Sequence, residues 1–176
     1  MAELHVIGEI VGGSGFSSRG LFCRWGAVSG RNWDLLEGID QGQTHIDYPE
    51  DDGGDAIWSH PVDLHYACRG IVGWPKLHFQ VWGQDTHGRN EICGYGFCHV
   101  PTSPGLHELQ CTTWRPEGTK GEQLSSFFVG GAPRLKLEEV CYGGGDRYRL
   151  QTRSSGVVEL KIAIVMKDFA KHGVVC

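Results

Sequence analysis

Two neighbouring stretches in which hydrophobic and polar residues alternate, 74–82 and 92–100, restrict the chain to a small set of folds. In the first stretch every second residue is apolar: Leu77, Phe79 and Val81. This period of two is the pattern of a β-strand that buries one face. A polar segment, 84–91, joins the stretches, and Gly94 and Gly96 in the second indicate close backbone packing or a β-bulge. We therefore predict a long β-hairpin.

Short apolar runs between turns recur along the rest of the chain and predict further strands. They cover residues 4–11, 21–28, 43–48, 57–67, 106–114, 148–152 and 157–166. Alternation is strongest in the last run, whereas 43–48 has little apolar content and suits a sheet edge. We expect turns at 12–15 and around Trp33. We also expect Pro61 to interrupt its strand, because central strands avoid proline.

One segment carries a helical signal. Residues 119–122 fit a capping box, and the apolar residues that follow recur at helical spacing, which predicts one short helix near 121–129. About eight strands at turn spacings predict an all-β fold, an antiparallel β-sandwich. At 176 residues the chain suits one domain, which we place at 4–167 with a short C-terminal tail at 168–176.

Composition and charge exclude several classes of partner. The formal net charge is −5 and no run of lysine and arginine is present, so we expect no nucleic-acid binding. The sequence has neither an apolar stretch of about 18 residues nor a charged and then apolar leader, so we expect no membrane span or secretory signal. Seven cysteines at irregular spacings, without such a signal, favour reduced thiols.

Histidine and cysteine are frequent enough to raise the possibility of a metal site. Cys93 and Cys98 are too widely spaced for a structural zinc pair, and no second pair matches them. His60 and His65 are five residues apart across a proline, so they need not face the same side. We therefore expect no metal ligands in either pair.

No motif predicts catalysis. The glycine cluster 12–15 lacks the Gly-Lys-Ser/Thr end of a phosphate-binding loop, and Gly-x-Ser-x-Gly and His-Glu-x-x-His are both absent from the sequence. Asp85 and Glu91 bracket a loop, where paired carboxylates are most often solvated. We expect no catalytic residue, no cofactor and no enzymatic activity.

Trp82 is the candidate partner-binding residue. It lies on the opposite face of its strand from Leu77, Phe79 and Val81. An exposed aromatic residue there is typical of a protein interface. The alternative, in which both faces of the strand are covered and Trp82 only packs, is equally compatible with the sequence.

Several stretches resemble the B9-domain family, and together the likeness spans nearly the whole chain. They are residues 1–8, 58–65, 73–82, 94–101 and 146–150. The resemblance implies a C2-like β-sandwich without catalytic function. It also implies a subunit of the assembly at the ciliary transition zone, which supports ciliogenesis and the diffusion barrier at the ciliary base.

The resemblance implies partners and a location as well. The partners are B9 domain-containing protein 1 and Meckel syndrome type 1 protein, and the location is the cytoplasm and cytoskeleton at the basal body and transition zone of the cilium. The rival interpretation is a C2-like module that binds lipid at the ciliary base without calcium. The acidic segment 50–55 opposes that interpretation, because anionic lipid repels it, so membrane contact is expected to be weak.

The C2 likeness can be tested at the positions where C2 domains bind calcium. The pattern of two aspartates one residue apart, followed by a third acidic residue, aligns with Gly83, Asp85 and Glu91. The first position has lost its carboxylate, and the loop at 12–20 carries none. Ca²⁺ takes six to eight oxygen ligands, so we expect no tight calcium site.

Overall fold

Nine antiparallel strands make up almost all of the described structure. The computed structural model describes residues 1–50, 54–117, 135, 139–143 and 151–172. The strands are β1 (Ala2–Ser14), β2 (Gly20–Val28), β3 (Trp33–Gly38), β4 (Gln41–Gln43), β5 (Ala56–Cys68), β6 (Lys76–Gln84), β7 (Asn90–His99), β8 (Gly105–Pro116) and β9 (Thr152–Lys167). Two short helices are α2 (Glu139–Tyr142) and η2 (Ala170–His172). No helix of these residues has the length and hydrophobicity to cross a bilayer.

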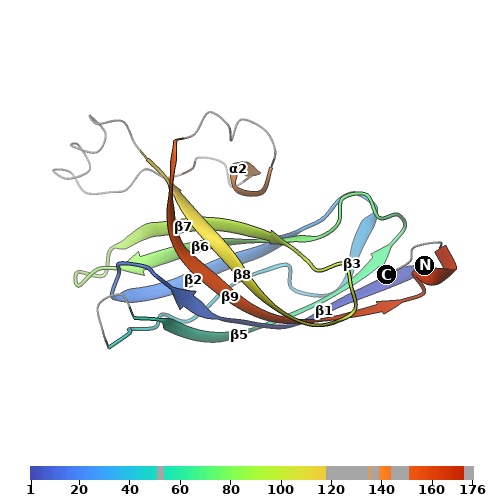
Figure 1. The fold of residues 1–176 in the computed structure, drawn as a ribbon, viewed down its shortest axis with the longest axis horizontal. Helices are drawn as coiled ribbons and strands as arrows, with labels where there is room; N and C mark the ends of the chain where they lie inside the picture. Colours follow the sequence, from blue (N-terminus) through green and yellow to red (C-terminus); the bar gives the residue numbers. More distant parts are fainter. Residues whose placement is uncertain (51–53, 118–134, 136–138, 144–150, 173–176) are drawn as a thin grey trace.

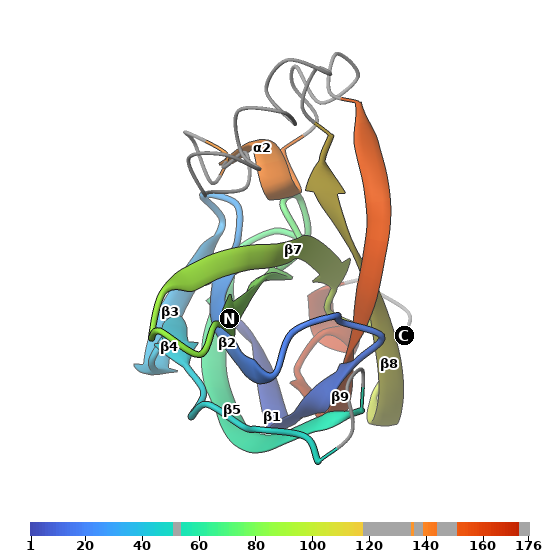
Figure 2. The same cartoon turned by 90° about the vertical axis from the view of Figure 1, so that its left-hand side faces the viewer.

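The strands form one curled sheet with the order β3-β5-β1-β9-β8-β7-β6-β2-β4. Among the described residues, β7 and β8 share a single register pair, Tyr95 and Trp114. Here the sheet folds over into two layers, with β6 and β7 above β1 and β5 in Figure 1. On the open side, seen end-on in Figure 2, Trp58 of β5 donates its indole N–H to the Leu21 carbonyl of β2 at 3.1 Å. The predicted all-β antiparallel sandwich is confirmed.

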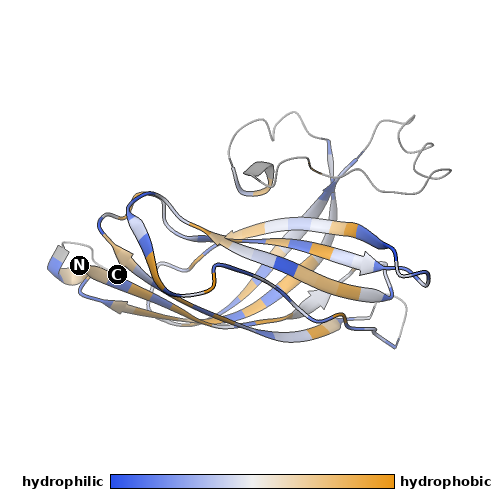
Figure 3. Cartoon of the chain, turned by 180° about the vertical axis from the view of Figure 1, so that it is seen from behind, coloured by the Kyte–Doolittle hydropathy of each residue, from blue (hydrophilic) through white to orange (hydrophobic). Residues whose placement is uncertain are grey.

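The core lies between the two layers and is built from the alternating residues of their inner faces. Hydrophobic and hydrophilic residues alternate along the strands in Figure 3. The fully buried side chains of the core include Leu4, Val6, Ile10, Leu21, Trp58, Leu64, Leu77, Phe79, Leu160, Ile162 and Ile164. Burying each aliphatic side chain of this size contributes roughly 1.5–3 kcal/mol of transfer free energy. The outward-facing residues are not needed for this core and are therefore available to contact other molecules.

The predicted hairpin is confirmed as β6 and β7. Its register shifts between Val81 and Trp82, which face Gly94 and Ile92, so Cys93 is an extra residue in a β-bulge. A Cβ at Gly94 would lie 2.7 Å from the Thr113 hydroxyl oxygen, so glycine lets β8 approach closely. The sequence signal for a bulge therefore has a packing cause.

Two predicted turns are wrong. Residues 12–14 continue β1, because Gly12 lets its backbone approach Ala56 of β5 and Gly13 leaves room for the ring of Trp58. Trp33 does not lie in a turn but begins β3. Its ring is buried and packs edge-on against Trp74, with the ring centroids 4.9 Å apart. Burial of this ring outweighs the polar composition around it.

Two predicted strands also differ from the structure. The strand expected at 43–48 reduces to β4 at Gln41–Gln43, although it does lie at a sheet edge, and Asp47 forms an isolated bridge with Leu21. Pro61 does not interrupt β5. Strand β3 pairs with β5 only between Leu64 and Cys68, so Pro61 has a neighbouring strand on one side only. Proline is tolerated at such an edge-like position.

Two expectations concern the end of the chain. The helix predicted near 121–129 lies outside the described residues, as does 173–176. Within the segment expected to be a tail, Phe169 is buried and packs against Trp74 with a centroid distance of 6.1 Å. This ring contact attaches the start of that segment to the core.

Candidate functional site

The turn between β6 and β7 holds the positions that would bind calcium in a C2 domain. The Asp85 carboxylate accepts the backbone N–H groups of His87 and Arg89 at 2.8 Å, and Arg89 Nε lies 2.7 Å from it. The backbone bond from Arg89, followed by its side chain, lowers the pKa of Asp85 below its usual value. The carboxylate of Asp85 therefore organises the turn with the donors of the turn itself.

Gly83 lies where side chains already fill the space. A Cβ at Gly83 would overlap the Ser18 hydroxyl and lie 2.8 Å from the Cys93 sulfur. Glu91, the third position, is exposed to solvent. One missing ligand, one carboxylate occupied by Arg89 and one exposed carboxylate do not make the oxygen cage that calcium takes.

A cavity of about 360 Å³ opens beside these positions, between the turn and the start of β9. Its lining combines acidic, basic and hydroxyl groups: Ser17, Ser18, Asp85, Glu91, Arg115, Arg153, Ser154 and Ser155. Two guanidinium groups with nearby hydroxyls are donors suited to an anion such as phosphate. The cavity is a small polar site in which the negative charges of the acidic residues offset the positive charges of the arginines.

Trp82 is half-buried on the outer face of β6. Its ring stacks on Phe22 with centroids 6.3 Å apart and planes 11° apart, and the Arg24 guanidinium lies 5.3 Å from its centroid. It also packs against an outer cluster of Ile92, Tyr95, Trp114, Cys141, Leu135 and Tyr142. Helix α2 lies over this face in Figure 1, and the Cys141 thiol donates to the Gly96 carbonyl at 3.3 Å. The outer face around Trp82 is therefore partly covered.

The outer face of the other layer is the more exposed one. Ile7, Leu106 and Val165 each have about half or more of their surface in solvent, at 45%, 74% and 52%. Register places them side by side, because Ala163 of β9 lies between Ile7 of β1 and Leu106 of β8. We call Ile7, Leu106, Ala163 and Val165 the outer strip. Neighbouring exposed apolar side chains are a common feature of interaction surfaces.

The outer strip was missed in the sequence analysis because its residues come from three strands. Alternation places Ile7 on the face of its strand opposite Leu4 and Val6, which is the one available signal.

The structure separates His60 and His65, the two histidines that were considered as a metal pair. His60 pairs with the core residue Ile10 and contacts Trp25 edge-on at 6.0 Å, whereas His65 pairs with His5 on the outer face. The two histidines of β5 thus lie on opposite faces.

Cysteine thiols are spread across both layers. None of the six described cysteines is in a disulfide: Cys23, Cys68, Cys93, Cys98, Cys111 and Cys141. Burial raises the pKa of Cys93 to about 11 and also raises the pKa of Cys23. Thiols that stay protonated at neutral pH are poor nucleophiles and poor metal ligands.

Comparison with known proteins gives a consistent result over the full chain. A family described as "B9-C2: Ciliary basal body-associated, B9 protein" matches residues 4–165. The chain is 54% identical over 176 residues to B9 domain-containing protein 2 of Homo sapiens, and the match covers 100% of both chains. It is 36% identical over 177 residues to the protein of the same name from Drosophila melanogaster, covering 99% and 98%.

Two more distant matches were found. Over 155 residues the chain is 33% identical to B9 domain-containing protein 1 of Homo sapiens, covering 87% of this chain and 76% of that one. Among solved structures, a C2 domain of plant Extended Synaptotagmin 1 matches with 13% identity and a TM-score of 0.44, covering 93% of each chain.

Proposed function

The chain belongs to the B9 protein family, and from this we propose that it is a non-enzymatic subunit of the assembly at the ciliary transition zone. In this role it supports ciliogenesis and the diffusion barrier at the ciliary base by binding other B9-domain proteins. The observation that carries the proposal is the 54% identity to B9 domain-containing protein 2 over the whole of both chains. The family is described as ciliary basal body-associated, which supports the location.

The proposed partners are B9 domain-containing protein 1 and Meckel syndrome type 1 protein. The first is a relative of this chain, at 33% identity, so a complex between the two joins similar domains. Related β-sandwiches can associate through sheet faces that remain apolar and exposed.

We place the contact on the outer strip. Three of its four residues are exposed and all four are contiguous, whereas the face around Trp82 is already partly covered by Leu135 and Tyr142. Trp82 lies at the edge of this covered area and is the second candidate residue for binding a partner. Aromatic and aliphatic anchors at the centre of an interface typically carry a large share of its binding energy.

The test is co-purification of this chain with the two proposed partners, followed by affinity measurement for each pair. The double variant Ile7→Ser with Val165→Ser is expected to weaken binding about tenfold or more, because it removes the apolar contact. The matched control is Ile71→Ser with Val72→Ser, which changes the same two residue types at 51% and 75% exposure in the β5–β6 connection.

Three outcomes are informative. Weaker binding for the outer-strip variant alone supports the proposed surface. Equal binding for both variants excludes that surface. If the unmodified chain binds neither partner, the proposed function itself is wrong.

The second candidate function is binding of a phosphate-bearing lipid headgroup without calcium. The observation in its favour is the cavity that contains Arg115 and Arg153 beside four serines of the same lining. Sedimentation with anionic and neutral vesicles, with and without calcium, tests it. Calcium-independent binding to anionic vesicles that is lost in the variant Arg115→Gln with Arg153→Gln supports a lipid role. Equal sedimentation with both kinds of vesicle counts against it.

A further inference from the structure

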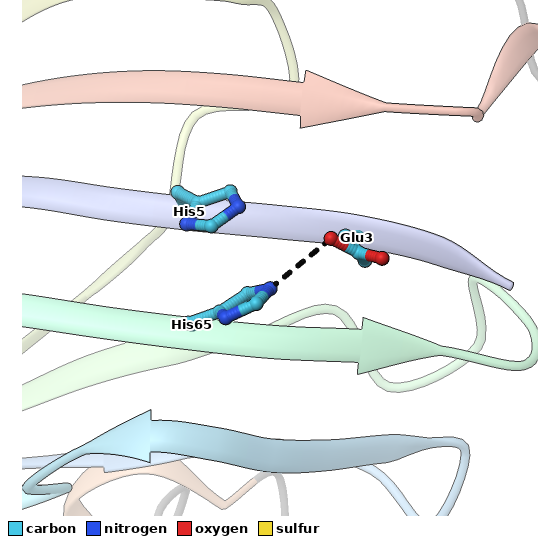
Figure 4. A group of neighbouring side chains, drawn as sticks. All are labelled: Glu3, His5 and His65. Carbon is cyan, nitrogen blue, oxygen red and sulfur yellow. Dashed lines mark ion pairs between the residues drawn. The ribbon is translucent and has the colours of Figure 1, made fainter.

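We propose that Glu3, His5 and His65 form a binding site for a divalent transition-metal ion such as Zn²⁺ on the outer face of β1 and β5. Figure 4 shows the three side chains side by side on the two strands, with the His65 ring directed at the Glu3 carboxylate and a dashed line marking their ion pair. One ligand atom from each residue lies within 4.8 Å of the other two. The site is separate from the turn at Asp85 and from the outer cluster around Trp82.

Strand register brings the three side chains together. His5 of β1 lies directly opposite His65 of β5, and Glu3 precedes His5 by two residues, so all three side chains share one face. The rings are stacked, with centroids 3.9 Å apart and planes 15° apart. Both strands have neighbours on each side at this point, since β9 pairs with β1 and β3 pairs with β5. Ligands on paired strands are held more precisely than ligands on loops.

One ring nitrogen of the group is buried, and Glu3 is its ion-pair partner. His65 Nε2 has no hydrogen-bond partner among the described residues, and it faces the Glu3 carboxylate at 3.4 Å. The carboxylate is the partner of this nitrogen when the ring is protonated there. In the neutral ring with its proton on Nδ1, Nε2 instead offers a lone pair beside the carboxylate, so a cation between the two would bind both groups.

The ligand types match those of zinc. Imidazole nitrogen and carboxylate oxygen bind Zn²⁺ at about 2.0–2.2 Å, and catalytic-type sites use three protein ligands. Neighbouring ligand atoms around tetrahedral zinc then lie roughly 3.4 Å apart. The ligand atoms now lie within 4.8 Å of one another and the two rings are stacked, so metal binding in this proposal requires the side chains of His5 and His65 to rotate. A fourth coordination position then remains open on the outer face.

The contact between Lys167 and Glu3 provides a specific test of this site. Its ammonium nitrogen lies 3.1 Å from both carboxylate oxygens of Glu3, so it competes directly with a metal ion for that ligand. Removing the lysine charge is therefore expected to strengthen metal binding. A metal held by unrelated surface histidines or by thiols would not respond in this way.

The experiment uses the full chain, freed of metal with a chelator and kept reduced. Zn²⁺ is titrated by calorimetry, and Co²⁺ is followed by its visible absorption. The variant His5→Gln with His65→Gln is expected to bind Zn²⁺ at least about tenfold more weakly than the unmodified chain. The matched control is His45→Gln with His99→Gln, two exposed histidines elsewhere, which should leave the affinity unchanged.

Lys167→Met is expected to raise the affinity about threefold or more, since an opposing charge is removed. This variant keeps all three ligands, so its result does not depend on whether the histidine variant folds. Absence of Zn²⁺ binding at about 1 mM overturns the site. Equal affinity of the unmodified chain and the histidine variant, with both shown to be folded by circular dichroism, also overturns it. The isolated chain suffices, so the result is independent of partner binding.

Discussion

At the scale of single residues, Gly83 is central to whether the turn between β6 and β7 can bind calcium. Its neighbours Ser18 and Cys93 occupy the space that a side chain would take. The Asp85 carboxylate is engaged by the turn that it stabilises. Calcium binding is therefore opposed by packing as well as by the loss of a carboxylate.

Restoring the missing carboxylate should accordingly destabilise the protein. We expect Gly83→Asp to lower the free energy of unfolding by roughly 1–3 kcal/mol, the typical effect of overpacking. We also expect millimolar calcium to leave the melting temperature of this variant unchanged. Chemical denaturation measures the first effect and a thermal melt with calcium or chelator the second.

Gly70→Asp is the control, because a Cβ there meets only the flexible Asn32 side chain, at 3.1 Å. A clear rise of the Gly83→Asp melting temperature in calcium would contradict this account, since a ligand at a hundred times its dissociation constant adds about 2.7 kcal/mol.

At the scale of elements, the outer face of β6 is stabilised by packing of its aromatic residues. Trp82 lies between Phe22, Arg24 and the outer cluster. The same strand buries Leu77, Phe79 and Val81 on its inner face. Strand β6 is thus covered on both sides along much of its length, in contrast to β1 and β9.

Truncation of Trp82 should therefore affect stability. We expect Trp82→Ala to lower the free energy of unfolding by about 2 kcal/mol, less than the ~3–5 kcal/mol of a fully buried tryptophan. Stability is measured by urea denaturation and partner affinity on the folded fraction of the same variant. A loss of affinity of about 2 kcal/mol with unchanged stability would instead identify Trp82 as the interface anchor.

The strands with regular alternation could be predicted from the sequence, and those set by tertiary contacts could not. The hairpin β6–β7 combines a period of two with a polar turn, so local sequence suffices. Strand β3 was missed because Asp34 and Glu37 disturb its alternation, and Trp33 contributes to it through contacts with Trp74 and Tyr66. Local composition does not reveal such contacts.

The outer-face residues were missed for a related reason. His5 and His65 are far apart in the sequence and meet through the register of β1 with β5. Alternation assigns each histidine to a face but does not fix the register between strands. The positions that correspond to calcium ligands could be identified from the sequence because they follow one another along a single hairpin.

At the scale of the whole molecule, buried thiols link stability to alkaline pH. Burial raises the pKa of Cys93 to about 11 in the folded chain. In the unfolded chain a cysteine has its ordinary value of about 8.5. The folded state therefore holds the proton more tightly, so its stability is full below about pH 8.5 and falls as the pH rises toward 11.

We expect Cys93 to account for a loss of roughly 2–3 kcal/mol between pH 8 and pH 11. Urea denaturation in reducing agent across this range measures the loss. In Cys93→Ala this part of the loss should disappear. An identical pH profile for the variant and the unmodified chain would show that Cys93 does not cause it.

The order of the strands makes the two ends of the sheet dependent on each other. Strands β3 and β4 follow one another in the chain, separated only by Ile39 and Asp40, yet they form opposite margins of the sheet. One continuous segment, residues 33–43, therefore supplies both edge strands of the sheet. Within it, β3 pairs with β5 and β4 pairs with β2. A proteolytic cut at the exposed Ile39 would make the two margins independent, with β3 still joined to the chain through β2, and β4 through the segment before β5. Each strand could then detach by itself and open the backbone of β5 or β2 to strand exchange between molecules.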